Sequence, residues 1–457
     1  MFKLYKYILF TYISLAYLPA AFAFSIDDPF DALQNSPDFT ECYEKQIDTN
    51  QAFYLADIIE IAICNSPTIR QNYMQARASA ASYGQALSGY LPKINSGANL
   101  NRKFSESDSL LNSRNKTYNS DTSANLSLSW LLFDFGATPA YIEKTKQNLL
   151  SANFSFDHNL RSTIYDITSA YYTMLSYHSA TQSALANEAS AKSAFEAASK
   201  RYELGLVALS DKLQAETSYA QAQLDRTRTE NNFQISKGKL LSLLNLAPYA
   251  KLNFAEFFPD IKELQFQGQL EDLIKSTLNK RSDLAAKKAE LQAATANLEA
   301  AQKKNYPTLS LTSSLGINDR FSNDDSNSNN GTIGLELSFP IFTGFSNTYN
   351  IMQSRYLVES AKADLKRTQR IVELDVWDTY QNWTTAIKNH EISIKLLDSA
   401  LENEKVALGA YKAGKGNILN LLNAQSKLAT ARVEKVSAVY NVFIAKSNLL
   451  RALAENE

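Results

Sequence analysis

The sequence contains an internal duplication, and this feature constrains the fold more than any other. In the front part of each half, Ile69 matches Leu284, which lies 215 residues later. In the back part the offset is 209, and it relates YELGLVALSDKLQA, which begins at Tyr202, to YKAGKGNILNLLNA, which begins at Tyr411. The chain is therefore expected to consist of one structural unit repeated twice. The change of offset predicts a loop of different length inside each unit.

Long helices are expected within each unit. The 14 glycines and 10 prolines of the 457 residues make up about 5%, whereas about 12% is usual. Residues 141–202 contain neither, so they predict one helix on the order of 90 Å long. A stripe of apolar residues spaced by seven, four, three, four and three predicts packing against other helices. Its members are Leu422, Ala429, Val433, Val436, Tyr440 and Phe443.

Each unit also contains a predicted pair of strands. The stretches SANLSLSW (residues 123–130) and TIGLELSF (residues 332–339) alternate apolar and polar residues, which is typical of a strand with two different environments. The preceding stretches 93–102 and 308–317 keep this alternation and are expected to be their partners. Strands of around ten residues match a tilted crossing of a bilayer.

The polar stretches between the paired strands, residues 104–121 and 318–330, are expected to be extracellular loops. Four strands cannot close a barrel, because bacterial barrels start at about eight. The chain is therefore expected to oligomerise, and three copies would supply twelve strands.

The N-terminus predicts a signal peptide over residues 1–23. Lys3 and Lys6 accompany an apolar stretch from Tyr7 to Leu18, and a small-x-small tripeptide ends at Ala23. Export to an oxidising compartment would permit a disulfide between the two cysteines, Cys42 and Cys64, and the sequence leaves their pairing open.

The composition argues against an enzyme. The three histidines, His158, His178 and His390, are isolated in helical stretches without metal-ligand spacing. No phosphate-binding loop or nucleophile motif is found. We therefore expect no catalytic site, no cofactor and no metal site. The net charge of −1 argues against nucleic acid as the main partner.

From about residue 52 to about residue 450 the chain resembles the TolC family of outer-membrane efflux and secretion channels. The resemblance rests on the duplicated plan, on the strand ends LLFDFG (131–136) and FPIFTG (339–344), and on the turn RYELGLVALSD (201–211). It implies an α+β membrane protein that forms a homotrimer. Its twelve strands would form one transmembrane β-barrel, four strands from each chain, and this barrel would continue into a long periplasmic α-helical barrel.

The resemblance also implies a function and its partners. The protein would be the passive exit duct of a tripartite efflux or type I secretion system, with outer-membrane lipid around its barrel and a large periplasmic part. It would conduct small molecules or polypeptides from an inner-membrane pump to the exterior, with a periplasmic adaptor protein, and it would be gated at its periplasmic tip.

The expected organisation follows the duplication. Two segments would lie at the periphery of the helical barrel, an N-terminal segment over residues 24–51 and an inter-repeat linker over residues 247–267. The first repeat is expected over residues 52–246, with its β-hairpin at about 93–135. The second is expected over residues 268–457, with its β-hairpin at about 308–343.

Within the resemblance, Asp211 and Tyr411, with Ser210, match gate-linking positions at the tip. A hydrogen bond from the tyrosine hydroxyl to the carboxylate would hold the gate closed, with a contribution of about 1–3 kcal/mol. The alternatives are a packed aromatic side chain for Tyr411 and a helix-capping role for Asp211. Family members often carry an arginine where this chain has Gly416, so the corresponding link is expected to be missing.

Two further sets of residues at the tip are matched by position. Asn420 and Asn423 take the places of two aspartates that form the constriction in many family members, so we expect weaker cation selectivity here. The residues that match the outward rims of the two turns are expected to dock the adaptor: Gly205, Leu206, Val207, Ala413, Gly414 and Lys415. An apolar pair at positions 206 and 207 suits docking, although the pair can equally serve to pack the turn.

Two other classes of protein remain as alternatives. A periplasmic adaptor also contains long helical hairpins, but it would lack amphipathic strand pairs. A structural coiled-coil surface protein would not repeat a strand–loop–strand unit at a matching offset.

Overall fold

The computed structural model describes residues 28–37, 52–109, 112–255, 270–321 and 326–455. The chain divides into two compact units. The first contains residues 28–37, 77–149 and 295–355, and the second contains the described residues of 38–76, 150–294 and 356–457. Both units therefore take segments from both sequence repeats.

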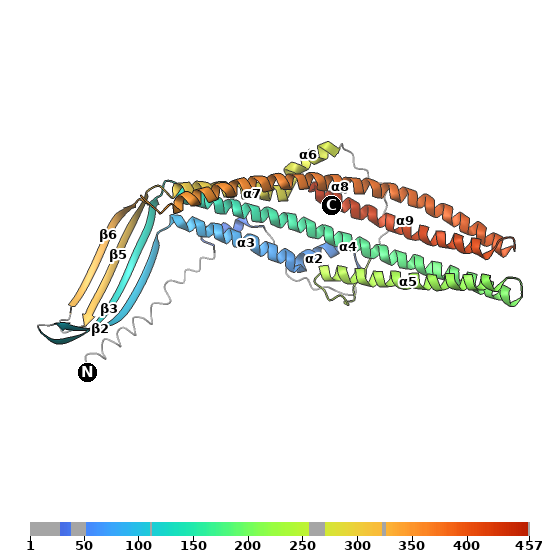
Figure 1. The fold of residues 1–457 in the computed structure, drawn as a ribbon, viewed down its shortest axis with the longest axis horizontal. Coiled ribbons are helices and arrows are strands. Elements are labelled where there is room, and N and C mark those ends of the chain that lie inside the picture. The colour runs from blue at the N-terminus through green and yellow to red at the C-terminus, as the bar shows by residue number, and fades with distance from the viewer. Residues whose placement is uncertain (1–27, 38–51, 110–111, 256–269, 322–325, 456–457) are drawn as a thin grey trace. The chain divides into compact units, whose positions relative to one another are not determined.

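The first unit contains a four-stranded antiparallel sheet. Its strands are β2 (Lys93–Ser109), β3 (Asn112–Phe133), β5 (Thr308–Phe321) and β6 (Ser326–Ser338). They lie side by side in the order β2-β3-β5-β6 (Figure 1). The two hairpins are those expected from the sequence, and the pairing of β3 with β5 joins the two repeats. Among the described residues, β2 and β6 each pair on one side only.

The strands are longer than predicted. In the first hairpin Glu106 still pairs with Lys116, and in the second Asn318 pairs with Ser328. Most of the residues expected to be loops, 104–121 and 318–330, therefore belong to strands, and that prediction was wrong. A strand ladder is made of backbone hydrogen bonds, which polar residues form as well as apolar ones. The loss of apolar alternation marks a change of surroundings and not the end of the strand.

One face of the sheet is apolar and exposed. Cross-strand neighbours on this face include Leu126 with Leu315 and Leu311 with Leu335. Eight of its large apolar side chains are between 46% and 78% exposed: Ile94, Leu100, Leu126, Leu315, Ile317, Ile333, Leu335 and Leu337. The opposite face carries serine, threonine and asparagine, and the Ser314 and Thr332 hydroxyls lie 2.6 Å apart on it. The predicted two-faced strands are confirmed.

The helices follow the duplication closely. Four helices of the first repeat, α2 (Leu55–Asn65), α3 (Pro67–Leu87), α4 (Ala137–Glu203) and α5 (Leu209–Leu243), have counterparts in the second. These are α6 (Leu270–Lys280), α7 (Ser282–Lys303), α8 (Ser346–Lys412) and α9 (Ile418–Leu453). Helices α4 and α8 have 67 residues each and are therefore on the order of 100 Å long. No helix in the described part of the chain is both long enough and apolar enough to cross a membrane.

The largest apolar core of the second unit joins both repeats. Ile58 of α2, Ile167 of α4, Leu240 of α5 and Tyr440 of α9 are buried together in it. Beside them β1 (Ala52–Phe53) pairs in parallel with β4 (Asn253–Phe254). The start of the first repeat therefore lies next to the beginning of the inter-repeat segment.

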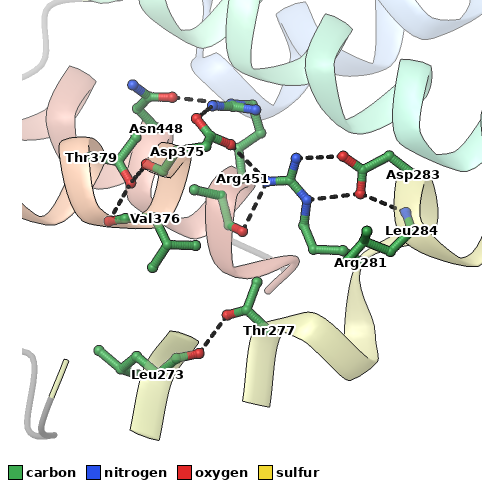
Figure 2. A network of polar contacts seen from close by, with 11 residues as sticks. Leu273, Thr277, Arg281, Asp283, Leu284, Asp375, Val376, Thr379, Asn448 and Arg451 are labelled. Carbon is green, nitrogen blue, oxygen red and sulfur yellow. Dashed lines mark hydrogen bonds and ion pairs between the residues drawn. The ribbon is translucent and has the colours of Figure 1, made fainter. Parts of the chain in front are cut away.

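A buried ion network lies where α6 meets α7 (Figure 2). The guanidinium of Arg281, whose side chain is 5% exposed, donates to Asp283 and Asp375 at 2.7 Å each. It also donates to the carbonyl oxygen of Ala452 in α9. Arg451, also in α9, donates to the other oxygen of Asp375 at 2.8 Å. This network ties the α6–α7 junction to α8 and α9.

Several sequence predictions lie outside the described residues. These are the signal peptide, Cys42, and most of the two expected peripheral segments. Cys64 lies in α2 and is disulfide-bonded, whereas Cys42, whose pairing the sequence left open, lies outside the described residues.

Candidate functional site

The two turns that connect α4 to α5 and α8 to α9 have the same geometry (Figure 1). The amide of Gly205 donates to Tyr202 O and that of Leu206 to Arg201 O. At the second turn Gly414 and Lys415 repeat this pattern with Tyr411 and Ala410. Gly205 has φ +70° and Gly414 has φ +72°. Both helices therefore end in a Schellman motif, and the left-handed residue is the glycine that such a turn requires.

The helices that leave the two turns begin differently. In α5 the N-cap is Ala208, without a side-chain hydrogen bond, and Asp211 lies in the first turn. A carboxylate there is favoured by the helix dipole. In α9 the N-cap is Asn417, and its side chain accepts a hydrogen bond of 2.9 Å from the amide of Asn420. The asparagine thus caps the second helix as its residue type predicts.

Tyr411 is buried at the second turn, where four helices meet. It is 4% exposed and packs against Ala198 of α4, Ala215 of α5 and Leu421 of α9. Its hydroxyl forms no hydrogen bond with any described residue. The hydrogen bond to Asp211 implied by the family resemblance is therefore not made within the single chain.

The other two predicted gate residues lie at the start of α5. Ser210 is exposed and Asp211 half-buried. The Ser210 hydroxyl donates to Asp211 at 3.4 Å, a long and therefore weak hydrogen bond. The structure thus places the three gate residues at the two turns, and among the described residues their side chains form no hydrogen bond from the first turn to the second.

Arg201 makes the link that the sequence analysis missed. It lies in the last turn of α4, and its guanidinium donates to the carbonyl oxygens of Tyr411 at 2.9 Å and Lys412 at 3.3 Å. The guanidinium carbon lies 4.4 Å from the centroid of the Tyr411 ring. The only sequence signal was an arginine one residue before the first tyrosine of the repeated turn. Nothing in the sequence indicated that it reaches the other hairpin.

The predicted constriction residues occupy one exposed face of α9. Asn420 and Asn423 are exposed, whereas Leu421 and Leu422 between them are buried. The two amide side chains therefore point away from the apolar cluster at the turn, as side chains three residues apart on a helix do.

The predicted docking residues lie on the surface of the two turns. Leu206 is 69% exposed and Val207 half-buried. Leu204, which the sequence analysis did not single out, is 73% exposed. In the second turn Ala413, Gly414 and Lys415 are exposed. The first turn therefore exposes apolar side chains, while the second exposes small residues and a lysine.

The comparison with family models decides the identity of this architecture. The model described as outer membrane efflux protein matches residues 58–246 and 273–455, which are the two repeats. The chain belongs to the outer membrane efflux protein family. Its function is that of an outer-membrane exit duct, and the family is one of transport.

Named relatives of this efflux protein extend over most of its length. Protein CyaE of Bordetella pertussis is 26% identical over 393 residues, which cover 84% of this chain and 80% of the relative. Outer membrane protein TolC of Escherichia coli is 23% identical over 418 residues, which cover 88% of this chain and 83% of TolC.

Solved structures share the fold of this efflux protein. The CmeC outer membrane channel of Campylobacter jejuni has a TM-score of 0.79 at 17% identity, covering 93% of this chain and 91% of CmeC. The outer membrane protein VceC of Vibrio cholerae has a TM-score of 0.76 at 19% identity, covering 88% of this chain and 96% of VceC. The expected channel fold, mostly helical with a smaller sheet, is confirmed.

Proposed function

We propose that three copies of the chain form one continuous duct. Twelve strands close a transmembrane barrel in the outer membrane, and the long helices form a tunnel in the periplasm. The duct passively conducts small molecules or polypeptides that an inner-membrane pump delivers through a periplasmic adaptor protein. The expected peripheral segments, residues 24–51 and 247–267, surround the helical tunnel, and the β1–β4 pair supports their proximity.

The observation that carries this proposal is the pair of open sheet edges. In the part of the chain that the structure describes, both β2 and β6 pair on one side only, while one face of the sheet is apolar and exposed. In lipid an unpaired strand edge leaves backbone donors and acceptors unsatisfied, at a cost of several kcal/mol for each group. Pairing β6 of one copy with β2 of the next removes both edges, and a symmetric ring of such contacts closes.

The assembly is tested in detergent extracts of outer membranes. Heat-resistant trimers in this fraction, which fall to monomers on boiling, are expected from a closed twelve-stranded barrel. A folded monomer in the soluble periplasmic fraction would contradict the proposal and favour an adaptor instead.

We place the gate at the repeated turns, because three copies bring six helical hairpins around one opening. Asp211, Ser210 and Tyr411 lie at these turns, and Asn420 and Asn423 present uncharged amides as the constriction. The apolar rim at Leu206 and Val207, with Gly205 and the exposed 413–415 turn, supports docking of the adaptor at the same end.

Single-channel conductance in a planar bilayer tests the duct and its gate. We expect the wild-type protein to be mostly closed, with a small conductance. We expect Asp211→Ala to raise that conductance if the first-turn carboxylate helps to keep the gate closed. A wide-open wild type that the substitution does not change would place the gate elsewhere. The absence of any channel from folded protein would contradict the duct.

A further inference from the structure

The last turn of α8 is held by a residue from another hairpin. A helix leaves its final carbonyl groups without intrahelical partners. In α8, which ends at Lys412, two of these oxygens accept hydrogen bonds from Arg201 of α4, at 2.9 Å from Tyr411 and 3.3 Å from Lys412. A cation at this position also faces the negative end of the helix dipole.

The geometry of this contact depends on an arginine. The guanidinium carbon lies 4.4 Å from the centroid of the Tyr411 ring, within the range of a cation–π interaction. Both hydrogen bonds come from one nitrogen, Nη2, while the planar guanidinium lies against the ring face, a contact that the compact ammonium of a lysine does not reproduce. Tyr411 itself is fixed, because it is buried among side chains of α4, α5 and α9.

Two polar connections that the family resemblance suggests, through the Tyr411 hydroxyl and through position 416, are not made among the described residues. The hydroxyl of Tyr411 has no hydrogen-bond partner among the described residues. A Cβ added at Gly416 would lie 3.2 Å from the carbonyl carbon and from the Cβ of Ala410. A side chain at position 416 therefore has to push against the last turn of α8.

We propose that Arg201 is the positioning residue that holds the second hairpin in the closed state of the gate. It does so through the backbone and the ring face of Tyr411, while the hydroxyl of Tyr411 takes no part. This inference rests on the proposed function, since it assumes a duct that closes at the repeated turns. It assigns this hold to the guanidinium of Arg201 and not to a hydrogen bond between the Tyr411 hydroxyl and a carboxylate. The contribution proposed for Asp211 is a separate one.

Three substitutions separate the ring and backbone contact from the hydroxyl. Arg201→Ala removes the whole contact, Arg201→Lys keeps the charge without the planar guanidinium, and Tyr411→Phe removes only the unpaired hydroxyl. Arg228→Ala on α5 is the matched control, because the Arg228 side chain is 71% exposed and pairs with Asp225 of its own helix. Each variant is purified as the full chain and measured by single-channel recording in a planar bilayer.

We expect Arg201→Ala to raise the open-to-closed ratio by about tenfold, since a hydrogen bond to a charged group is worth at least this factor. Arg201→Lys should give a smaller increase, and Tyr411→Phe and Arg228→Ala should match the wild type. Unchanged gating in Arg201→Ala overturns the inference. An increase of the open-to-closed ratio in Tyr411→Phe also overturns it, because the hydroxyl would then help to keep the gate closed.

The state of the protein is checked alongside gating. Helical content and heat-resistant assembly should be unchanged, so that a change of gating reports the loss of the Arg201 contact and not misfolding. If Arg201→Ala fails to fold, Arg201→Lys decides, and its agreement with the wild type overturns the inference. A wild-type protein that folds but forms no channel contradicts the proposed function itself, which is a separate outcome.

Discussion

The Arg281 guanidinium and the Asp375 carboxylate form a 2.7 Å ion pair that joins the α6–α7 junction to α8. Arg281 lies between α6 and α7, and Asp375 lies in the middle of α8. Asp283 and Arg451 complete a network in which each arginine faces a carboxylate. The charges are therefore balanced although the Arg281 side chain is 5% exposed.

Removing Arg281 should destabilise the second unit strongly. Arg281→Ala leaves Asp283 without its cation and takes one cation from Asp375. Breaking a buried ion pair in this way costs about 3–5 kcal/mol. Lys362→Ala removes an exposed pair with Glu359 in the same helix as Asp375, and it should cost less than about 1 kcal/mol. Chemical denaturation followed by circular dichroism gives the free energy of unfolding of both variants. Equal losses would contradict the conclusion that the buried network stabilises the second unit more than an exposed ion pair does.

Stability should fall as the pH drops below about 6.5. Burial lowers the pKa of His158 below its usual 6.5, and the charges of Arg281 and Arg451 lower it further, against the opposing effects of Asp283 and Asp375. The unfolded chain then takes up a proton that the folded chain resists, so this contribution is present above 6.5 and is lost on acidification.

A second group acts at lower pH. Burial alone would raise the pKa of Asp283, but the hydrogen bonds and charge of Arg281 lower it below its usual value. Its contribution to the free energy of unfolding is therefore lost only as the pH falls below the ordinary range of a carboxyl group.

The effect of His158 is measured at higher pH. The melting temperature should decline as the pH is lowered from 8 to 5, and His158→Gln should flatten the decline. An unchanged slope in this variant would exclude His158 as its origin.

The turn glycines should resist substitution for a conformational reason. Gly205 and Gly414 have positive φ, and a Cβ would meet no atom within 4 Å at either position. Alanine should therefore cost about 1–2 kcal/mol through backbone strain alone. Gly409 lies inside α8 with equally open space, and Gly409→Ala should stabilise by up to about 1 kcal/mol. Hydrogen exchange at the tip measures these local effects, and faster exchange in Gly409→Ala would contradict the argument.

Charge at the predicted constriction should control ion selectivity. The double substitution Asn420→Asp and Asn423→Asp repeats three times in the trimer and creates an anionic ring, which favours cations. Bilayer recordings should show a higher cation-to-anion permeability ratio and block by a trivalent cation from the periplasmic side. Asn389→Asp adds the same charge at an exposed position of α8 away from the turn, and it should change neither. Tight trivalent block of the wild type would contradict the weaker selectivity expected here.

The helical plan was predictable because it depends on local chemistry. The scarcity of glycine and proline predicted the long helices, and the repeated glycine predicted both turns at Gly205 and Gly414. The extent of the strands was not predictable. The mostly polar residues 104–121 concealed a ladder that continues, with one irregularity, as far as Ser109 and Asn112.

Equivalent positions of the two repeats can have different roles, and the duplication in the sequence does not reveal this. By the offset of 215, Arg281 corresponds to Ser66, whose hydroxyl accepts a hydrogen bond from the amide of Ile69 at the start of α3. One position thus supplies a local contact in the first repeat and the centre of a buried ion network in the second. No pattern along the chain distinguishes these roles, because Asp375 and Arg451 are distant in sequence.

The sequence by itself therefore determined the elements of this efflux protein: two copies of a helix, a strand pair and a long helical hairpin, with a turn that needs glycine. These follow from residue spacing and backbone preference, which act over a few residues. Only the tertiary structure decided which residue connects the two turns. Arg201 reaches the carbonyl of Tyr411 across 210 positions of sequence, and such a contact exists only after α4 and α8 have packed together.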